Sequence, residues 1–497
     1  MERTGSNAIF VGVALALVGA ALFLSAHGNV ERASFKAFYC AGQAVKERVD
    51  PYKVEPLRSC ERRLAPSTLP DGYVEPAPLP GYAMMPFAAL ATLPPRLASV
   101  IFAILLVLAS ALAACVLAEM LPASRSAVLL AFAPLTLLNV AYGEVVPIAL
   151  AAICAAAFLI WRGHWFGAGL AVCVALIQPN VGLPAVLATF IFAPRCRAAV
   201  GLGVALLAVV SVLAVGVDRN VEYLTQVLPG MANAEIVASD QYNLSHLLYS
   251  AGLTASVGSL LGKLWFGLLV VFGVVIAGTL AVRRRQPELL PLVPPACVLL
   301  FGIYLHDIQI LLSLAAALAI AARLRGVAFK TIGIVAVALL VAVWTQRAGV
   351  AALTINAVGV ACGVWAVSEV KNRIGVSVLA ALATVVCVLL LQHVQPPLVA
   401  SNLVTQAFHA ASHDQAFSAW AAYLRATPAL TAPASLLKFP TWIGLLLVAI
   451  GAVRLCLQAP EPHETDVAMR GATLTQSGSR EPQLASAPCN VSSRKYD

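Results

Sequence analysis

The sequence predicts an all-α, polytopic membrane protein with about 12–14 transmembrane helices and a large first external loop. Of its 497 residues, 60% are hydrophobic and 11% are charged, whereas soluble domains are nearer half apolar and a quarter charged. Apolar runs of about 17–25 residues recur from end to end, and each can cross roughly 30 Å of hydrocarbon as a helix. Barrel strands would alternate apolar and polar residues, so we expect the runs to be helices.

Basic residues orient these expected helices. Lysine and arginine gather in the short connections, as in Arg195 with Arg197, Arg283–Arg285 and Arg323 with Arg325. Such loops stay in the cytoplasm, so the formal net charge of +9 reflects topology and predicts no nucleic-acid partner. With both termini cytoplasmic, the spans fall near residues 7–26, 97–121, 126–142, 145–161, 164–178, 181–193, 198–217, 256–282, 288–304, 308–322, 327–344, 348–367, 374–391 and 440–457.

The domain organisation follows from these spans. Residues 1–457 are expected to form one transmembrane domain, with external loops at 27–81, 218–255 and 393–438. The first run is longer than a signal-peptide core, so we interpret it as a retained helix. Residues 79–94 are apolar but broken by prolines, which predicts a re-entrant or interfacial segment. Residues 458–497 are polar and lack periodicity, so they are expected to form a disordered cytoplasmic tail.

Polar residues that interrupt the apolar runs all fall on the external side of this topology. They are Gly143-Glu144, Gln178-Pro179-Asn180, the stretch from Asn243 to His246, and His306-Asp307. Ionisable groups are costly to bury at a membrane, so these residues are candidates for a functional site. The simpler alternative is that outer helix ends contain polar residues with no common role.

Cysteine and histidine spacings predict no metal site or other cofactor. Most of the 11 cysteines lie inside apolar runs, where they act as small hydrophobic residues. Cys40 and Cys60 share the first external loop and can pair if it faces an oxidising compartment, although spacing alone does not establish the geometry. His409 and His413 have helical i, i+4 spacing beside Asp414, but no third ligand accompanies them.

The order of motifs resembles a known family. The first external loop contains Ser34-Phe35-Lys36-Ala37-Phe38-Tyr39-Cys40-Ala41-Gly42 and then Val49-Asp50-Pro51-Tyr52. Gly143-Glu144, Gln178-Pro179, Asn243-Leu244-Ser245 and His306 follow in order. This series resembles glycosyltransferase family 87, the polyprenyl-phosphate-mannose-dependent mannosyltransferases of the GT-C superfamily. The resemblance covers residues 7 to 345 and implies a GT-C-like fold.

The resemblance implies a reaction and its partners. A sugar, mannose in the family, would move from a polyprenyl-phosphate carrier to a hydroxyl of a glycolipid or glycan acceptor. The site would face the non-cytoplasmic side of the cell membrane, among membrane lipids. Such a displacement needs a base for the acceptor proton and donors that stabilise the leaving phosphate.

The chain departs from the family at the base itself. The family has Asp where this chain has Ser34, and a serine cannot act as that base unaided. The departure leaves open an altered base, an altered reaction or a catalytically silent relative. The alternatives outside the enzyme class are a transporter or flippase for a lipid-linked substrate and a structural subunit of an envelope assembly. The expected catalytic residues are Glu144, His306 and Asp50, and the expected donor- or substrate-binding residues are Ser34, Lys36, Tyr39, Tyr52, Gln178, Asn243 and Asp307.

Three of these assignments have simpler alternatives. Asp50 precedes a proline, and its side chain can cap a turn instead of reacting. Glu144 can be a solvated charge at a helix end, and His306 an interfacial residue without a role. Asp307 can raise the basicity of His306, although adjacent residues on a helix point about 100° apart.

Overall fold

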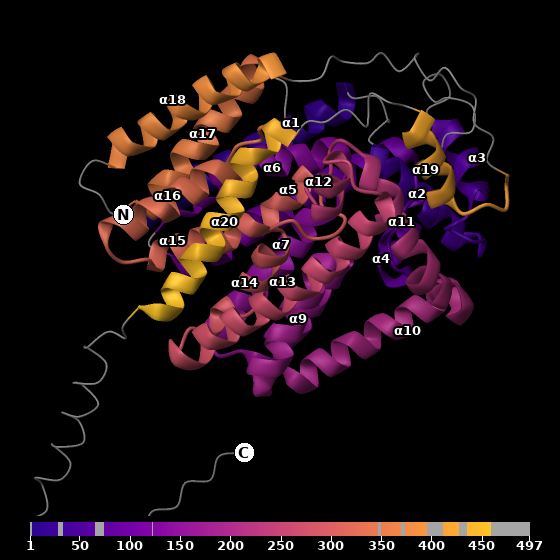
Figure 1. The fold of residues 1–497 in the computed structure, drawn as a ribbon, viewed down its shortest axis with the longest axis horizontal. Helices are drawn as coiled ribbons and strands as arrows, with labels where there is room; N and C mark the ends of the chain where they lie inside the picture. The colour runs from indigo at the N-terminus through magenta and orange to yellow at the C-terminus, as the bar shows by residue number, and fades with distance from the viewer. Residues whose placement is uncertain are drawn as a thin grey trace, which may run out of the picture. The chain divides into compact units, whose positions relative to one another are not determined.

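Helix follows helix along the whole described part of the chain (Figure 1). The structure is a computed structural model that describes residues 2–27, 33–64, 74–121, 123–345, 349–368, 373–394, 411–426 and 435–458. Helices account for 83% of these residues, which contain no strand. The predicted all-α class is therefore confirmed. Residues 459–497 of the expected tail and His409 lie outside the described residues.

Seven of the described helices are long and apolar enough to cross a membrane. The starts of two of them carry the expected signals. Pro95 is the first residue of α5 (Pro95–Glu119), and Ser124 caps α6 (Arg125–Tyr142) by accepting a hydrogen bond from the Ala127 N–H. The seven are α5 (Pro95–Glu119), α6 (Arg125–Tyr142), the run Pro194–Val237 that contains α10 (Arg197–Glu222) and α11 (Leu228–Ala234), α13 (Ala255–Arg283), α17 (Val350–Val367), α18 (Arg373–Leu391) and α20 (Ser435–Leu457).

Shorter apolar helices pack among these seven. Some contain an internal proline, as α9 (Pro179–Phe192) does at Pro184 and α4 (Gly81–Leu90) at Pro86. The ten residues of α4 cannot span a membrane alone, as the prolines of residues 79–94 predict. The remaining apolar helices are α1 (Glu2–His27), α4 (Gly81–Leu90), α7 (Val146–Trp161), α8 (Trp165–Val174), α9 (Pro179–Phe192), α15 (Leu311–Arg323) and α16 (Val327–Val341).

The span expected at residues 288–304 is wrong as a continuous helix. Only α14 (Val293–Val298) is α-helical there, and all six of its residues are buried. Pro287, Pro291, Pro294 and Pro295 cannot sustain an unbroken helix, because proline lacks the N–H and clashes with the preceding turn. The chain then continues through turns to His306, so this stretch is irregular backbone enclosed by other helices.

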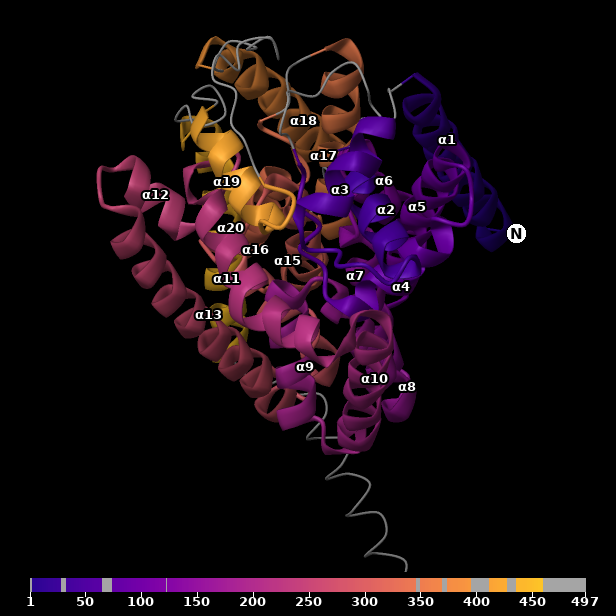
Figure 2. The ribbon, with the colours of Figure 1, turned by 90° about the vertical axis from the view of Figure 1, so that its right-hand side faces the viewer.

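The three segments expected as long polar loops are partly helical and contact one another. The first contains α2 (Ala33–Lys46) and α3 (Val54–Leu64), the second α12 (Leu244–Ser250), and the third α19 (Ala416–Ala426). The Lys53 ammonium lies 3.0 Å from the Glu222 carboxylate, and the Val54 N–H donates to the Asp414 carbonyl at 2.8 Å. Figures 1 and 2 show α2, α3 and α19 gathered at one end of the helices. This proximity is expected if the segments share one side of the membrane.

Candidate functional site

Ser34 and Glu144 meet although they are 110 residues apart in the sequence. The Ser34 hydroxyl donates a hydrogen bond of 2.5 Å to Glu144 Oε1. Ser34 lies in the first turn of α2, and Glu144 lies in the turn between α6 and α7. A carboxylate therefore lies within hydrogen-bond distance of Ser34, the residue that opens the first-loop motif.

Gly143 explains why Glu144 reaches Ser34. It ends α6 in the left-handed conformation, with φ of 75°, and its N–H donates to the Asn139 carbonyl at 2.8 Å. A Cβ at this position would lie 2.4 Å from the Cβ of Phe35. Glycine meets both demands because it has no Cβ. The end of α6 therefore rests directly on α2, next to Ser34.

His306 lies between an acid and an amide. Its Nδ1 is 3.0 Å from Asp240 Oδ2, and its Nε2 is 2.8 Å from Gln241 Nε2. The Gln241 amide oxygen accepts a hydrogen bond of 3.0 Å from the Leu305 N–H, which turns the amide NH₂ toward the imidazole. Asn243 donates to the same oxygen and caps α12 through the His246 N–H. The segment before α12 thus fixes the orientation of His306.

The turn before His306 is strained and closely held. Phe301 and Tyr304 adopt positive φ angles of 63° and 49°, which are uncommon for aromatic residues. Asn180 Nδ2 donates to the Tyr304 carbonyl at 3.0 Å, and the Tyr242 N–H donates to the Leu305 carbonyl at 2.7 Å. The Tyr304 ring meets His306 edge-on, with centroids 5.2 Å apart. Such strain persists only where the surroundings fix it, and it concentrates at functional sites.

Electrostatics join Glu144 and His306 in one site. Burial disfavours charge on His306, but Asp240, Glu235 and Glu144 together outweigh burial and raise the pKa of His306 to about 10. The Gln241 N–H opposes this shift, because a protonated Nε2 has no lone pair to accept it. The pKa of His306 is nevertheless raised, because three carboxylates act against one neutral dipole. Burial raises the pKa of Glu144, and the Ser34 hydrogen bond and the His306 charge only partly offset it.

Four candidates of the first loop have structural contacts. Asp50 Oδ1 accepts a hydrogen bond of 2.9 Å from the Tyr52 N–H, which is the turn role left open by the sequence. The Tyr52 hydroxyl donates to the Leu79 carbonyl, and the Tyr39 hydroxyl to the Leu93 carbonyl. Lys36 is 2% exposed, and its ammonium lies 3.8 Å from the Glu75 carboxylate. These residues hold the first segment in place, and none of the contacts described here joins them to His306.

Three other candidates surround the His306 turn. Gln178 accepts a hydrogen bond of 3.5 Å from Gln309, whose carboxamide oxygen accepts from the His306 N–H at 2.8 Å. Asn243 reaches His306 through Gln241. The Asp307 carboxylate accepts a hydrogen bond of 2.8 Å from the Thr345 hydroxyl, so the partner of Asp307 is Thr345 and not the neighbouring His306 imidazole. The structure therefore gathers Gln178, Asn243 and His306 in one hydrogen-bond network. The Ser34–Glu144 pair is linked to it by the electrostatic interaction of Glu144 with His306, and Asp307 has a different partner.

Sequence reasoning misses the residues that complete this network. Asp240, Gln241 and Tyr304 carry no motif of their own, and their role depends on contacts with distant segments. The sequence offers one local signal for two of them: Asp240 and Gln241 lie within three residues of Asn243, in an expected external loop.

Glu235, Asp240 and His306 also form the group of described residues that could hold a metal ion. Their ligand atoms lie within 4.8 Å of one another. Those atoms are already engaged, however, because Glu235 accepts hydrogen bonds from Gln241 and Trp420, and Asp240 pairs with His306. The donor set can be explained as a hydrogen-bond network without a metal.

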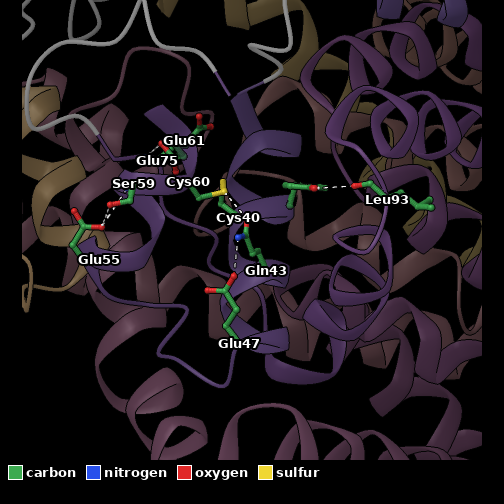
Figure 3. Close-up of a disulfide and its surroundings, with 10 residues drawn as sticks. Cys40, Gln43, Glu47, Glu55, Ser59, Cys60, Glu61, Glu75 and Leu93 are labelled. Carbon is green, nitrogen blue, oxygen red and sulfur yellow. Dashed lines mark hydrogen bonds between the residues drawn. A yellow bond between two sulfur atoms is a disulfide. The ribbon is translucent and has the colours of Figure 1, made fainter. Parts of the chain in front are cut away.

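A disulfide fixes the first segment beside the site (Figure 3). Cys40 of α2 and Cys60 of α3 are joined, with their Cα atoms 5.6 Å apart. Gln43, Glu61 and Glu75 lie around it, and the Gln43 carboxamide oxygen is 3.4 Å from Cys60 Sγ. The pairing that the sequence left open is therefore present. It ties the helix that carries Ser34 to its neighbour.

The fold and site define an all-helical polytopic membrane protein with a paired acid and histidine at its helix ends. Residues 79–305 match the model of glycosyltransferase family 87. The match contains Glu144, Gln178, Asn243 and the turn that leads to His306, and it confirms the resemblance seen in the motifs. No curated protein and no solved structure matches the chain. The family match supports a membrane glycosyltransferase.

Proposed function

We propose that this protein is a polyprenyl-phosphate-dependent hexosyltransferase of the cell membrane. It would move a sugar, mannose by the resemblance, to a hydroxyl of a glycolipid or glycan on the non-cytoplasmic side. The observation that carries the proposal is the hydrogen bond between Ser34 and Glu144. It places a carboxylate against the residue that replaces the family's base.

Glu144 is the general base in this proposal. As the acceptor oxygen attacks the anomeric carbon, its proton passes to the Glu144 carboxylate, and the bond from the anomeric carbon to the phosphate oxygen breaks. Burial raises the pKa of Glu144, which makes its carboxylate a better proton acceptor. Ser34 orients the carboxylate through the oxygen that it contacts.

His306 stabilises the leaving group. The phosphodiester of the donor carries one negative charge and leaves as a phosphate monoester with a second. An imidazolium held by Asp240 carries a positive charge, and a positive charge near that phosphate lowers the energy of the developing negative charge. The raised pKa of His306 keeps the ring charged at neutral pH, where a free histidine is largely neutral.

The disulfide supports the proposed orientation. Disulfides persist in oxidising compartments and are rare in the cytosol. Cys40 and Cys60 lie in the same segment as Ser34, so the compartment that oxidises them is the one that this segment faces. A donor that carries its sugar on a polyprenyl lipid is available on that side without a soluble nucleotide.

Sugar transfer by purified protein tests the proposal. Radiolabelled polyprenyl-phosphate-mannose is incubated with the protein and a membrane lipid extract, and the product is separated from the donor. We expect Glu144→Gln to reduce the rate by about 10²–10⁴-fold, the range of general-base catalysis. The combined variant Ser34→Asp with Glu144→Gln restores the family pattern, and we expect it to recover part of the activity.

Matched controls decide between outcomes. Glu47→Gln makes the same chemical change at an exposed carboxylate just after α2, which accepts a hydrogen bond from Gln43, and this variant is expected to transfer sugar normally. Absence of transfer by the wild type with a range of lipid-linked donors would contradict the function. Transfer that survives in both Glu144→Gln and His306→Ala would contradict the site but not the class.

A further inference from the structure

The C-terminal helices reach into the candidate site, although they lie beyond the matched residues 79–305. Lys438, near the start of α20, is fully buried, and its ammonium donates a hydrogen bond of 2.7 Å to the Gln241 carbonyl. Four residues on, the Trp442 indole N–H donates to the Tyr242 carbonyl at 3.1 Å. Two successive carbonyls of the segment that carries Asp240 are thus held from one helix.

A buried lysine in an apolar helix requires an explanation, because an ammonium without partners is expensive to remove from water. Among the described residues, the partners of Lys438 lie on the side of the site. Beyond the Gln241 carbonyl, its nitrogen lies 5.6 Å from the centre of the Tyr242 ring, and it interacts electrostatically with Asp240 and Asp307. Its position is therefore determined by the segment around Asp240.

The same helix also supports the strained turn before His306. The Trp442 ring packs against Phe301 with centroids 5.0 Å apart, and Phe301 has the positive φ noted above. The Trp420 indole of α19 donates to the Glu235 carboxylate at the start of the Asp240 segment. The segments that carry Asp240 and His306 are thus both contacted by α19 or α20.

We propose that Lys438 and Trp442 are positioning residues that keep the Asp240–His306 pair in register with Glu144. The inference rests on the proposed function for its catalytic consequence, but the positioning itself can be measured independently. Neither side chain needs to touch the substrate. They act through the backbone of residues 241 and 242, which sets where Asp240 and Gln241 meet the imidazole.

Amide hydrogen exchange tests the positioning without an activity assay. The Tyr242 N–H donates to Leu305 and the Leu244 N–H to Phe301, so these two amides report whether the segment remains docked on the His306 turn. In Lys438→Met, which keeps the length of the side chain, we expect their exchange to become roughly tenfold faster, as loss of a charged hydrogen bond implies. Unchanged exchange at both amides would overturn the proposal.

Lys330→Met is the matched control. Lys330 also donates its ammonium to a backbone carbonyl, that of Ala322 at 3.3 Å, but it lies on α16. Its loss is expected to leave exchange at Tyr242 and Leu244 unchanged. Where Lys438→Met does not yield folded protein, Trp442→Phe serves instead, because it keeps an aromatic ring and removes only the N–H donor to Tyr242.

Kinetics then separate positioning from general destabilisation. We expect Lys438→Met to lower kcat by about tenfold to a hundredfold, the scale of a small displacement of catalytic groups. In an Asp240→Asn background the same substitution is expected to cost much less, because the pair that it positions is already broken. Equal losses in both backgrounds would overturn the proposal. Altered exchange in a protein that transfers no sugar would contradict the proposed function and leave the positioning intact.

Discussion

At the scale of single residues, Ser34 and Glu144 form the contact on which the proposed chemistry rests. The two side chains share a hydrogen bond although one comes from α2 and the other from the turn after α6. The resemblance to family 87 predicts an Asp at position 34, and we propose that the Glu144 carboxylate replaces it. Position by position the sequence shows only the loss of that acid, whereas the structure shows a carboxylate within hydrogen-bond distance of Ser34.

The pH dependence of sugar transfer follows from this pair. Glu144 acts as a base only when ionised, so the rate is expected to fall as the pH falls through its raised pKa. The Ser34 hydrogen bond lowers that pKa, so Ser34→Ala is expected to raise it and move the acid limb of the kcat profile to higher pH. Ser59→Ala removes an equivalent serine–glutamate hydrogen bond, that to Glu55, and is expected to leave the limb in place. A limb that moves to lower pH in Ser34→Ala would contradict the assignment.

At the scale of helices, the end of α6 determines where the site forms. Gly143 allows the close approach to Phe35, and Gly42 allows a similar one, since a Cβ there would lie 2.4 Å from the Phe87 carbonyl carbon. The Ala41-Gly42 part of the first-loop motif is thus a packing requirement between α2 and α4. The aromatic residues of that motif are buried around it, with Phe35 at 0% and Phe38 at 4% exposure.

Substitution of Gly143 tests this contact. Gly143→Ala places a side chain at positive φ, which costs about 1–2 kcal/mol, and it adds a clash with Phe35 worth about 1–3 kcal/mol. Gly163→Ala is the control, because Gly163 has φ of 79° but no atom within 4 Å of the added Cβ. Thermal unfolding in detergent is expected to show a larger loss of stability for Gly143→Ala, together with slower sugar transfer. Equal losses in the two variants would show that the contact with Phe35 does not matter.

The elements that sequence predicts well are those governed by apolar length. Helices α5, α13 and α18 lie close to their expected ranges, because an uninterrupted apolar run leaves the backbone no other way to pair in lipid. The same criterion predicts a helix over residues 288–304, which are irregular because a hydropathy average does not include the effect of proline on the backbone. The sequence predicts a loop where α2 and α3 lie, because their polar residues exclude a membrane span. Composition does not reveal that α2 is nevertheless almost entirely buried against other helices.

At the scale of the whole molecule, the site is made by segments distant in sequence. Glu144 and His306 could be predicted because polar groups at apolar helix ends stand out. Asp240, Gln241 and Lys438 could not, because their significance lies in contacts across 66, 65 and 197 residues. The spacing of residues in a sequence predicts which side chains are neighbours on the same helix. It does not predict which helix ends contact one another.

Among the described residues, the Cys40–Cys60 disulfide is the covalent cross-link between helices. It closes a loop between residues 20 apart, so its removal is expected to cost about 3 kcal/mol. Denaturant unfolding of a Cys40→Ser, Cys60→Ser double variant measures this cost, and Cys387→Ser, at an exposed free thiol, provides the control. Stability equal to that of the wild type would show that α2 and α3 are held by packing alone.

The contact between Lys438 and Gln241 has a consequence for biogenesis. The two residues are 197 positions apart, so at ordinary rates of translation Lys438 leaves the ribosome about 10–40 s after Gln241. During that interval the upstream helices can insert, but the Asp240 segment has no partner for two of its carbonyls. A nascent chain is therefore expected to remain inactive until α20 enters the bilayer and Lys438 reaches the Gln241 carbonyl.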